Sequence, residues 1–288
     1  MLSLWALFLL SAMVISWALD INTRLTLSGQ ANRALEAEAL ACSGAEVAMN
    51  PTVTPHCPAL RQVKGNQSYR VQMTGEGGRL NLNWLLAGEN PQRLEILRKY
   101  LENRGIDLNE REQMIDCLLD WVDPDNLVRL NGAEQEGDYQ PANTMFARID
   151  DLRRVRGWTD FASGPNWDAD FTISSTGPID LAWASRDVLL ALPGVNEQIA
   201  DQFLSVRRGP DGIDGPDDDA EFTSLEEVRL ALGFTPEQFK ALAGLVGFKD
   251  QVVRVVSVGR SGDVTRTVRM VIRKTGGGVP QLISWKEL

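Results

Sequence analysis

The chain has 288 residues, of which 43% are hydrophobic and 24% are charged, so it can bury more than one packed core. Its formal net charge of −10 argues against nucleic acid as the main partner, because phosphate binding needs a net basic face. The same charge is compatible with divalent cations. One histidine and three cysteines supply neither an assignable catalytic triad nor a Cys-x-x-Cys zinc motif. We therefore expect a protein that is not an enzyme.

Residues 1–19 carry no charged side chain, and Asp20 ends this apolar run. A helix of that length would measure about 28 Å, close to the roughly 30 Å hydrocarbon core of a bilayer. A cleaved signal peptide is disfavoured, because no basic residue precedes Arg24 and residues 16–20 make a poor small-x-small cleavage site. Two alternatives remain: a plain membrane anchor, or an anchor that is also an assembly surface.

The apolar run leads directly into residues 20–49, where apolar or small residues recur at spacings of three and four. The sequence therefore predicts one helix of about 45–50 residues, half in lipid and half amphipathic. An ordinary globular domain rarely needs so long a helix. A filament subunit does, because it packs that helix against its neighbours.

Downstream, alternation of polar and apolar residues predicts a strand over 68–73, and residues 79–84 form an extended segment that leads into helices. In the helix expected over residues 109–121, Asn109 is the predicted N-cap, with Glu112 three residues later. Periodicity predicts helices over residues 91–103, 109–121, 141–156, 187–192, 195–208, 225–232 and 236–245, and a strand over residues 171–175.

Two segments of the chain resemble each other. The segment Gly177-Pro178-Ile179-Asp180-Leu181-Ala182-Trp183 echoes Gly78-Arg79-Leu80-Asn81-Leu82-Asn83-Trp84, and each leads into helices. This similarity predicts an internal repeat of two small helical units. Trp84, Trp121 and Trp183 recur beside helix ends, so we interpret them as core anchors.

The C-terminal region changes character. Apolar and polar residues alternate over 252–259 and 265–274, on either side of a glycine-containing turn. Residues 282–285 can add one more strand. These strands and strand 68–73 can pair in one sheet that covers the apolar stripe of the long helix. The predicted fold class is α+β, with a long N-terminal helix packed on a small antiparallel sheet and a large α-helical insertion.

The first acidic loop contains Asp120, Asp123 and Asp125, followed by Glu134. Calcium binds six to eight oxygens from carboxylates and carbonyls, so close carboxylates on a turn with a distant Glu suit it. The spacing is not that of an EF-hand. The alternative is a solvated acidic loop in which an aspartate caps a helix.

The second acidic loop, residues 211–219, contains Asp211, Asp214 and Asp217 among further aspartates and glycines. Its glycines allow a wrapped backbone that offers carbonyl oxygens, and its like charges repel unless a cation or water neutralises them. A calcium site and a solvated acidic loop both fit this pattern.

The segment Leu192-Pro193-Gly194-Val195 has the look of a helix-hairpin-helix, which suggests a membrane-tethered DNA-binding protein as an alternative function. Asn196 stands where a second glycine usually lets a phosphate approach, and the surroundings are acidic. A structural hairpin is therefore favoured. A calcium-dependent envelope hydrolase is a third hypothesis, for which no nucleophile or base can be named.

The order of motifs resembles that of the K-type minor pseudopilins of the bacterial type II (general) secretion system. The matching pieces are the N-terminal helix, Gly78–Asn83, Asp120-Trp121-Val122-Asp123-x-Asp125, Gly132-Ala133-Glu134 with Tyr139, the predicted helix from Asn143 to Gly157, and Leu192–Val195. Pseudopilins are made with a short basic leader that ends in Gly, whereas this sequence begins inside the apolar run, so its mature N-terminus is not defined.

This resemblance implies a pilin-like core interrupted by an insertion of SAM-like helical units, at the tip of a short periplasmic pseudopilus. The implied partners are the I-type and J-type minor pseudopilins and other pseudopilus subunits, with a single pass through the inner membrane. It also implies Ca²⁺ bound by Asp120, Asp123, Asp125 and Glu134, and by the loop containing Asp211, Asp214 and Asp217.

The expected domain organisation follows from these elements. Residues 1–19 form the transmembrane half of the helix, and residues 20–85 form its soluble half and the first strand of the core. The insertion spans residues 86–248, with helical units at 86–157 and 177–248, and residues 249–288 complete the core. Cys42 and Cys57 flank the end of the long helix and could form a disulfide outside the cytoplasm.

Overall fold

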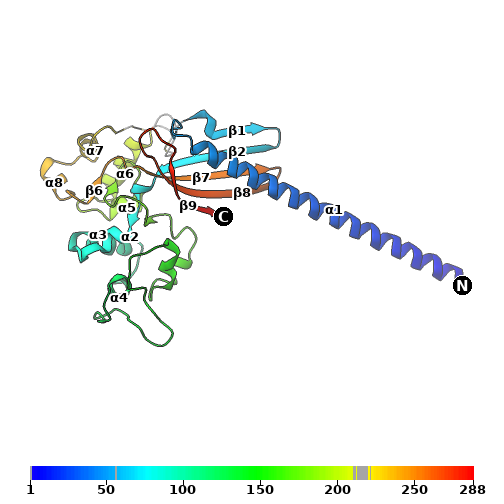
Figure 1. Ribbon diagram of the computed structural model, residues 1–288, viewed down its shortest axis with the longest axis horizontal. Helices are drawn as coiled ribbons and strands as arrows, with labels where there is room; N and C mark the ends of the chain where they lie inside the picture. Colours follow the sequence, from blue (N-terminus) through cyan, green and yellow to red (C-terminus); the bar gives the residue numbers. More distant parts are fainter. Residues whose placement is uncertain (1, 56, 210–211, 213–219, 221) are drawn as a thin grey trace. The chain divides into compact units, whose positions relative to one another are not determined.

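The computed structural model describes residues 2–55, 57–209, 212, 220 and 222–288. By internal packing the chain divides into two compact units, one of residues 1–72, 255–270 and 285–288, and one of residues 73–254 and 271–284. The predicted α+β class is confirmed by the long N-terminal helix, the sheet and the helical content (Figure 1). The finer ranges expected from the sequence stay predictions.

Helix α1 (Leu2–Ala48) runs without interruption over 47 residues, which confirms the single long helix (Figure 1). Its large apolar side chains from Leu4 to Leu19 are exposed. Among the described residues, it is the helix that is long and apolar enough to cross a membrane. The exposed apolar half is thus a candidate membrane span of the length expected from residues 1–19.

The second half of α1 buries a stripe of small residues, Ala37, Ala41, Ala45 and Ala48. Small side chains let the helix backbone approach strand β7 (Val252–Ser261) closely. A Cβ atom added to Gly259 would lie 2.0 Å from the carbonyl oxygen of Ala37 and 2.4 Å from the amide of Ala41. Glycine is therefore the residue that fits at position 259.

The sheet has the strand order β1-β2-β7-β8-β9. Its other strands are β1 (Arg61–Lys64), β2 (Gln67–Gly75), β8 (Val264–Arg273) and β9 (Gln281–Glu287). The N-terminal strand thus joins the C-terminal hairpin in one sheet, as predicted from the sequence. Strand β1 was not predicted, because all four of its residues are exposed and show no alternation of burial. It pairs antiparallel with β2 around a turn at Gly65, whose φ is 62°.

The helical part of the chain consists of short elements. They are α2 (Leu82–Leu86), α3 (Pro91–Asn103), α4 (Leu108–Val122), α5 (Arg186–Leu190), α6 (Glu197–Arg207), α7 (Leu225–Ala231) and α8 (Pro236–Lys240). Short strands β3 (Leu80–Asn81), β4 (Phe171–Thr172), β5 (Ile179–Asp180) and β6 (Val246–Gly247) lie between them. Their apolar faces form a continuous core that includes Trp121, Trp158 and Phe171.

Several local predictions were wrong. The helix predicted over residues 141–156 is limited to the 3-10 turns Ile149–Arg154, because Asn143 has a φ of 48° and the Asn83 side chain accepts the amide hydrogen of Phe146. The N-cap of α4 is Asp107 rather than Asn109. Strand β4 ends at Thr172, and α8 ends at Lys240 before a series of turns.

The predicted internal repeat has a structural counterpart. In each copy the first short strand pairs in parallel with a strand that follows the helices: β3 with β4, and β5 with β6. Asn81 and Asp180 occupy equivalent places at the ends of β3 and β5. Asn81 donates to the carbonyl of Ser175 at 2.8 Å, and Asp180 accepts the amide hydrogen of Asp250 at 3.1 Å. Each side chain therefore ties its strand to the chain that leaves the partner strand.

The two copies also pack on each other reciprocally. A Cβ atom added to Gly177 would lie 2.4 Å from the Trp84 ring, and one added to Gly78 would lie 2.3 Å from the backbone of Trp183. The first glycine of each segment thus packs against the tryptophan of the other segment. This contact explains why both residue types recur at the same spacing.

A buried ion pair fixes the turn that precedes the first copy. Glu76, which is 1% exposed, accepts hydrogen bonds from Arg254 Nε at 2.7 Å and Nη2 at 2.8 Å. The Thr172 hydroxyl donates to the same carboxylate at 2.6 Å. Glu76 thus links its turn to β7 and β4, and Arg79 Nη1 supplies a second cation to the same carboxylate at 3.2 Å.

The reciprocal glycine contacts predict a large effect of a single methyl group. We expect Gly78→Ala and Gly177→Ala each to lower the free energy of unfolding by about 2–3 kcal/mol, because the tryptophan and its backbone must move. Gly276→Ala is the control, since nothing lies within 4 Å of its added Cβ. Denaturant unfolding of the full-length chain in detergent checks this, and equal losses in all three variants would contradict it.

Candidate functional site

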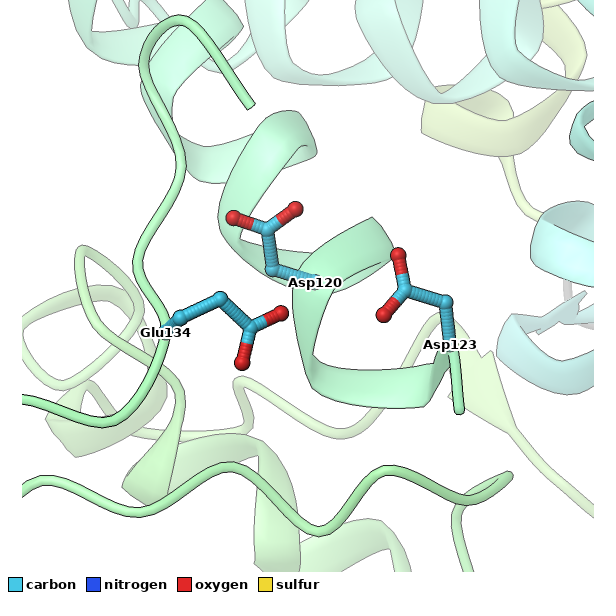
Figure 2. A group of neighbouring side chains, drawn as sticks. All are labelled: Asp120, Asp123 and Glu134. Carbon is cyan, nitrogen blue, oxygen red and sulfur yellow. The ribbon is translucent and has the colours of Figure 1, made fainter. Parts of the chain in front are cut away.

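The candidate site lies where helix α4 ends. Asp120 occupies the last turn of α4, and Asp123 is its C-cap, with its amide bonded to the Leu119 carbonyl at 3.0 Å. Glu134 approaches from the returning loop, and its carboxylate is directed toward that end of the helix (Figure 2). One carboxylate oxygen of each residue lies within 4.8 Å of the others. The negative end of a helix dipole is an unfavourable place for acidic groups, so a cation is expected there.

The carboxylates are shielded from water. Asp120 is fully buried and Glu134 is 5% exposed. Both oxygens of Glu134 and Oδ1 of Asp123 are buried without a hydrogen-bond partner in the described part of the chain. Burial of a charged oxygen without a partner is costly, which distinguishes this cluster from a solvated acidic loop.

Arg129 supplies a positive charge from within the same loop. Its Nη1 donates to Asp120 Oδ1 at 2.6 Å and to Asp123, and its Nη2 donates to Glu89 at 2.7 Å. Burial acts to lower the pKa of Arg129, but hydrogen bonds to Asp123 and Asp120 and the charge of Glu89 raise it overall. Arg129 therefore stays charged and neutralises part of the cluster.

The Glu134 carboxylate is not among the groups to which the Arg129 guanidinium donates in the described part of the chain. Burial, followed by the charges of Asp120, Asp123 and Asp125, raises its pKa above the ordinary value, and Arg129 only partly opposes this. The protein environment thus disfavours an ionised Glu134 that has no partner. A second or stronger cation would remove this penalty.

The structure places the other predicted ligands differently. Asp125 is exposed and lies outside the group of three, where its Oδ1 accepts the amide hydrogen of Leu127 at 2.8 Å. Asp211, Asp214 and Asp217 lie outside the described residues. Arg129 and Glu89 were missed from the sequence, although Arg129 is the one basic residue between Asp120 and Glu134.

The predicted core role of Trp121 is confirmed next to the site. Trp121 is 1% exposed, and its ring stacks on Phe146 with centroids 6.2 Å apart. Cys117, one turn before it, is buried, and burial raises the pKa of its thiol to about 11. Cys42 and Cys57 are free thiols in this structure. The aromatic packing fixes the end of α4 and hence the two aspartates.

The hairpin between α5 and α6 was the basis of the DNA-binding alternative. Gly194 has a φ of 78°, as the turn requires, and Asn196 is the N-cap of α6. The Asn196 side chain accepts the amide hydrogen of Ile199 at 2.9 Å. It thereby occupies a donor that a phosphate would need, and Glu197 adds a negative charge at the same helix start.

Comparisons with known proteins place this geometry in context. Residues 78–162, which include Asp120, Asp123 and Glu134, match the family model of type II secretion system (T2SS) protein K. The type II secretion system protein K of Pectobacterium carotovorum subsp. carotovorum is 31% identical over 75 residues, which are 24% of this chain and 23% of that protein. The corresponding protein of Dickeya chrysanthemi is 30% identical over 69 residues, 23% of this chain and 20% of that protein. The matches therefore span less than a quarter of the length of these relatives.

The fold is similar over a much larger part of the chain. A chain in the crystal structure of the GspK–GspI–GspJ complex from the enterotoxigenic Escherichia coli type 2 secretion system has a TM-score of 0.62 and 15% sequence identity. The similarity covers 92% of this chain and 99% of that chain. Together with the family match and the named relatives, it confirms the resemblance to K-type minor pseudopilins.

The tight contact at Gly132 predicts that the site tolerates no added methyl group. A Cβ atom at position 132 would lie 1.9 Å from Asp120 Oδ2, which cannot move without disturbing its bonds to Arg129. We expect Gly132→Ala to lower the free energy of unfolding by about 2–3 kcal/mol. In the control Gly164→Ala, the added Cβ lies at an ordinary 3.5 Å from the Phe161 carbonyl oxygen. Similar unfolding free energies for the two variants would contradict the tight packing around Asp120.

Proposed function

We propose that this chain is a K-type minor pseudopilin at the tip of the pseudopilus of a type II secretion system. In that position it nucleates pseudopilus assembly and supports the export of folded proteins across the outer membrane. The fold carries the proposal, because the similarity to a chain of the GspK–GspI–GspJ complex extends over 92% of this chain, far beyond residues 78–162. The role is structural rather than catalytic.

The proposed partners are the I-type and J-type minor pseudopilins, followed by other subunits of the pseudopilus. The proposed location is the bacterial inner membrane, crossed once by residues 1–19, with the rest of the chain in the periplasm. The two halves of α1 support this arrangement, because the first half suits lipid and the second half is already packed on its own sheet through alanines.

The soluble half of α1 also carries exposed leucines. Leu25, Leu27 and Leu35 are each at least 60% exposed, although they belong to the same helix as the buried alanine stripe. Exposed leucines beside a membrane span suit contact with the long helices of neighbouring subunits. The DNA-binding alternative is disfavoured by the Asn196 cap and by the net charge of −10.

We further propose that Asp120, Asp123 and Glu134 bind Ca²⁺. Ligand oxygens lie 2.3–2.6 Å from calcium, so oxygens on opposite sides of the ion are about 5 Å apart. Carboxylate oxygens that lie within 4.8 Å of one another suit this size, and the unpartnered oxygens of Glu134 and Asp123 suit the chemistry. The ion would neutralise the cluster and tie the end of α4 to the loop at Glu134. Binding by Asp125 and by Asp211, Asp214 and Asp217 stays a prediction.

Co-purification tests the assembly proposal. The full-length chain in detergent should form a complex with the I-type and J-type minor pseudopilins of its own secretion system. Leu35→Glu, at a side chain that is 65% exposed, should weaken that complex at least about tenfold, because a charge would enter an apolar helix contact.

Val63→Glu is the matched control, since Val63 is similarly exposed, at 78%, but belongs to β1 rather than to α1. The absence of any complex, or an equal loss in both variants, would count against the proposed role of the helix.

Thermal unfolding tests the ion proposal. Calcium at a hundredfold excess over Kd should stabilise the full-length chain by about 2.7 kcal/mol through binding to the native state. Glu134→Gln should raise stability by about 1 kcal/mol in EDTA, because it removes a buried unpaired charge, and should reduce the gain from calcium.

Glu136→Gln is the control, because the Glu136 side chain is exposed and pairs with Arg156 at 2.9 Å. A Glu134→Gln variant that gains as much from calcium as the unmodified chain would rule out Glu134 as a ligand.

A further inference from the structure

Arg129 stands in direct competition with any cation that binds the acidic cluster. Its Nη1 lies 2.6 Å from Asp120 Oδ1 and also contacts Asp123 Oδ2. A metal ion bound to the same oxygens would lie at nearly the same distance from them as this nitrogen. Two cations cannot share that space, because they would overlap and repel each other.

A divalent ion would satisfy the cluster better than Arg129 does. Arg129 contributes one positive charge to three carboxylates, and it leaves both Glu134 oxygens and Asp123 Oδ1 without a partner. Its other branch bonds to Glu89, outside the cluster, at 2.7 Å. The guanidinium therefore holds the aspartates but does not reach Glu134.

Arg129 also anchors an apolar segment of the loop. Its neighbours Leu127, Val128 and Leu130 are 76%, 61% and 96% exposed. Both the Arg129 side chain and its backbone amide bond to Asp120, the amide at 3.3 Å. Beyond these bonds, Asn131 attaches the loop to Asp116 at 3.1 Å. The position of residues 127–130 thus depends strongly on the bonds of Arg129.

We propose that the Arg129 guanidinium takes the place of the ion between Asp120 and Asp123, and that calcium displaces it and releases the apolar segment Leu127–Leu130 into a different conformation. The proposal rests on the ion site proposed above and adds a residue that opposes ion binding. Because the guanidinium must leave the aspartates before the ion binds, the apparent affinity for calcium is lower than that of a site without Arg129. The exposed apolar surface of the loop thereby becomes dependent on calcium.

Calcium titration of the full-length chain in detergent tests whether Arg129 competes with the ion. In Arg129→Met the competing charge is gone, so calcium should bind at least about tenfold more tightly than to the unmodified chain. Arg98→Met is the matched control, because Arg98 is similarly part-buried and pairs with Glu112 at 3.0 Å, away from the cluster. It should leave calcium affinity unchanged. Equal or weaker binding by Arg129→Met would overturn the proposal.

Limited proteolysis gives a second readout that does not need the variant to fold in EDTA. Trypsin cleavage after Arg129 in the unmodified chain, located by mass spectrometry, should become faster in calcium than in EDTA once normalised to cleavage of an added reporter peptide. Slower trypsin cleavage after Arg129 in calcium would overturn the proposed displacement even if calcium binds. If the unmodified chain binds no calcium, the ion site itself fails, while the proposed assembly role is still judged by partner binding.

Discussion

The close approach of α1 to strand β7 is the constraint on which the rest of the first unit depends. Ala37 and Ala41 face Gly259 at a distance that leaves no room for a Cβ atom. Such contact fixes the helix against the sheet along its second half, because neither backbone can rotate without a clash. The first half carries exposed apolar residues and needs another environment, so one helix joins a fixed core to a lipid-compatible span.

In the second unit, side-chain hydrogen bonds and packing stabilise helices that are too short to be stable alone. Helices of five to fifteen residues have little stability of their own, so caps and packing define them. Asn81 and Asp180 tie equivalent strands in the two repeats, and Trp84 and Trp183 pack against the opposite glycines. The end of α4 is built on this scaffold and concentrates negative charge there. A cation is the physical complement of that arrangement, and among the described residues Arg129 provides one.

The sequence predicts the features that depend on regular spacing. The uncharged run to Leu19 and the small residues after it indicate the long helix, and alternation indicates the strands that form the sheet. Strand β1 escapes prediction because both of its faces are exposed. The region from residue 141 to 148 is irregular because Asn143 adopts a positive φ, which periodicity cannot reveal.

The site is only partly readable in the same way. Asp120, Asp123 and Glu134 are brought together as the motif suggests, whereas Asp125 turns to its own backbone. Arg129 could not be assigned from spacing, because it reaches Asp120 from an irregular loop whose path is set by tertiary contacts. Burial separates this cluster from a solvated acidic loop, and burial is a property of the folded chain.

Site-specific photo-crosslinking would show whether the soluble half of α1 contacts pseudopilus subunits, as proposed above. A photoreactive residue at Leu27, which is exposed just beyond the apolar run, would be activated in intact cells that express the whole secretion system. We expect a crosslink to an I-type or J-type minor pseudopilin. Crosslinks to lipid alone, or to no protein of that system, would contradict it.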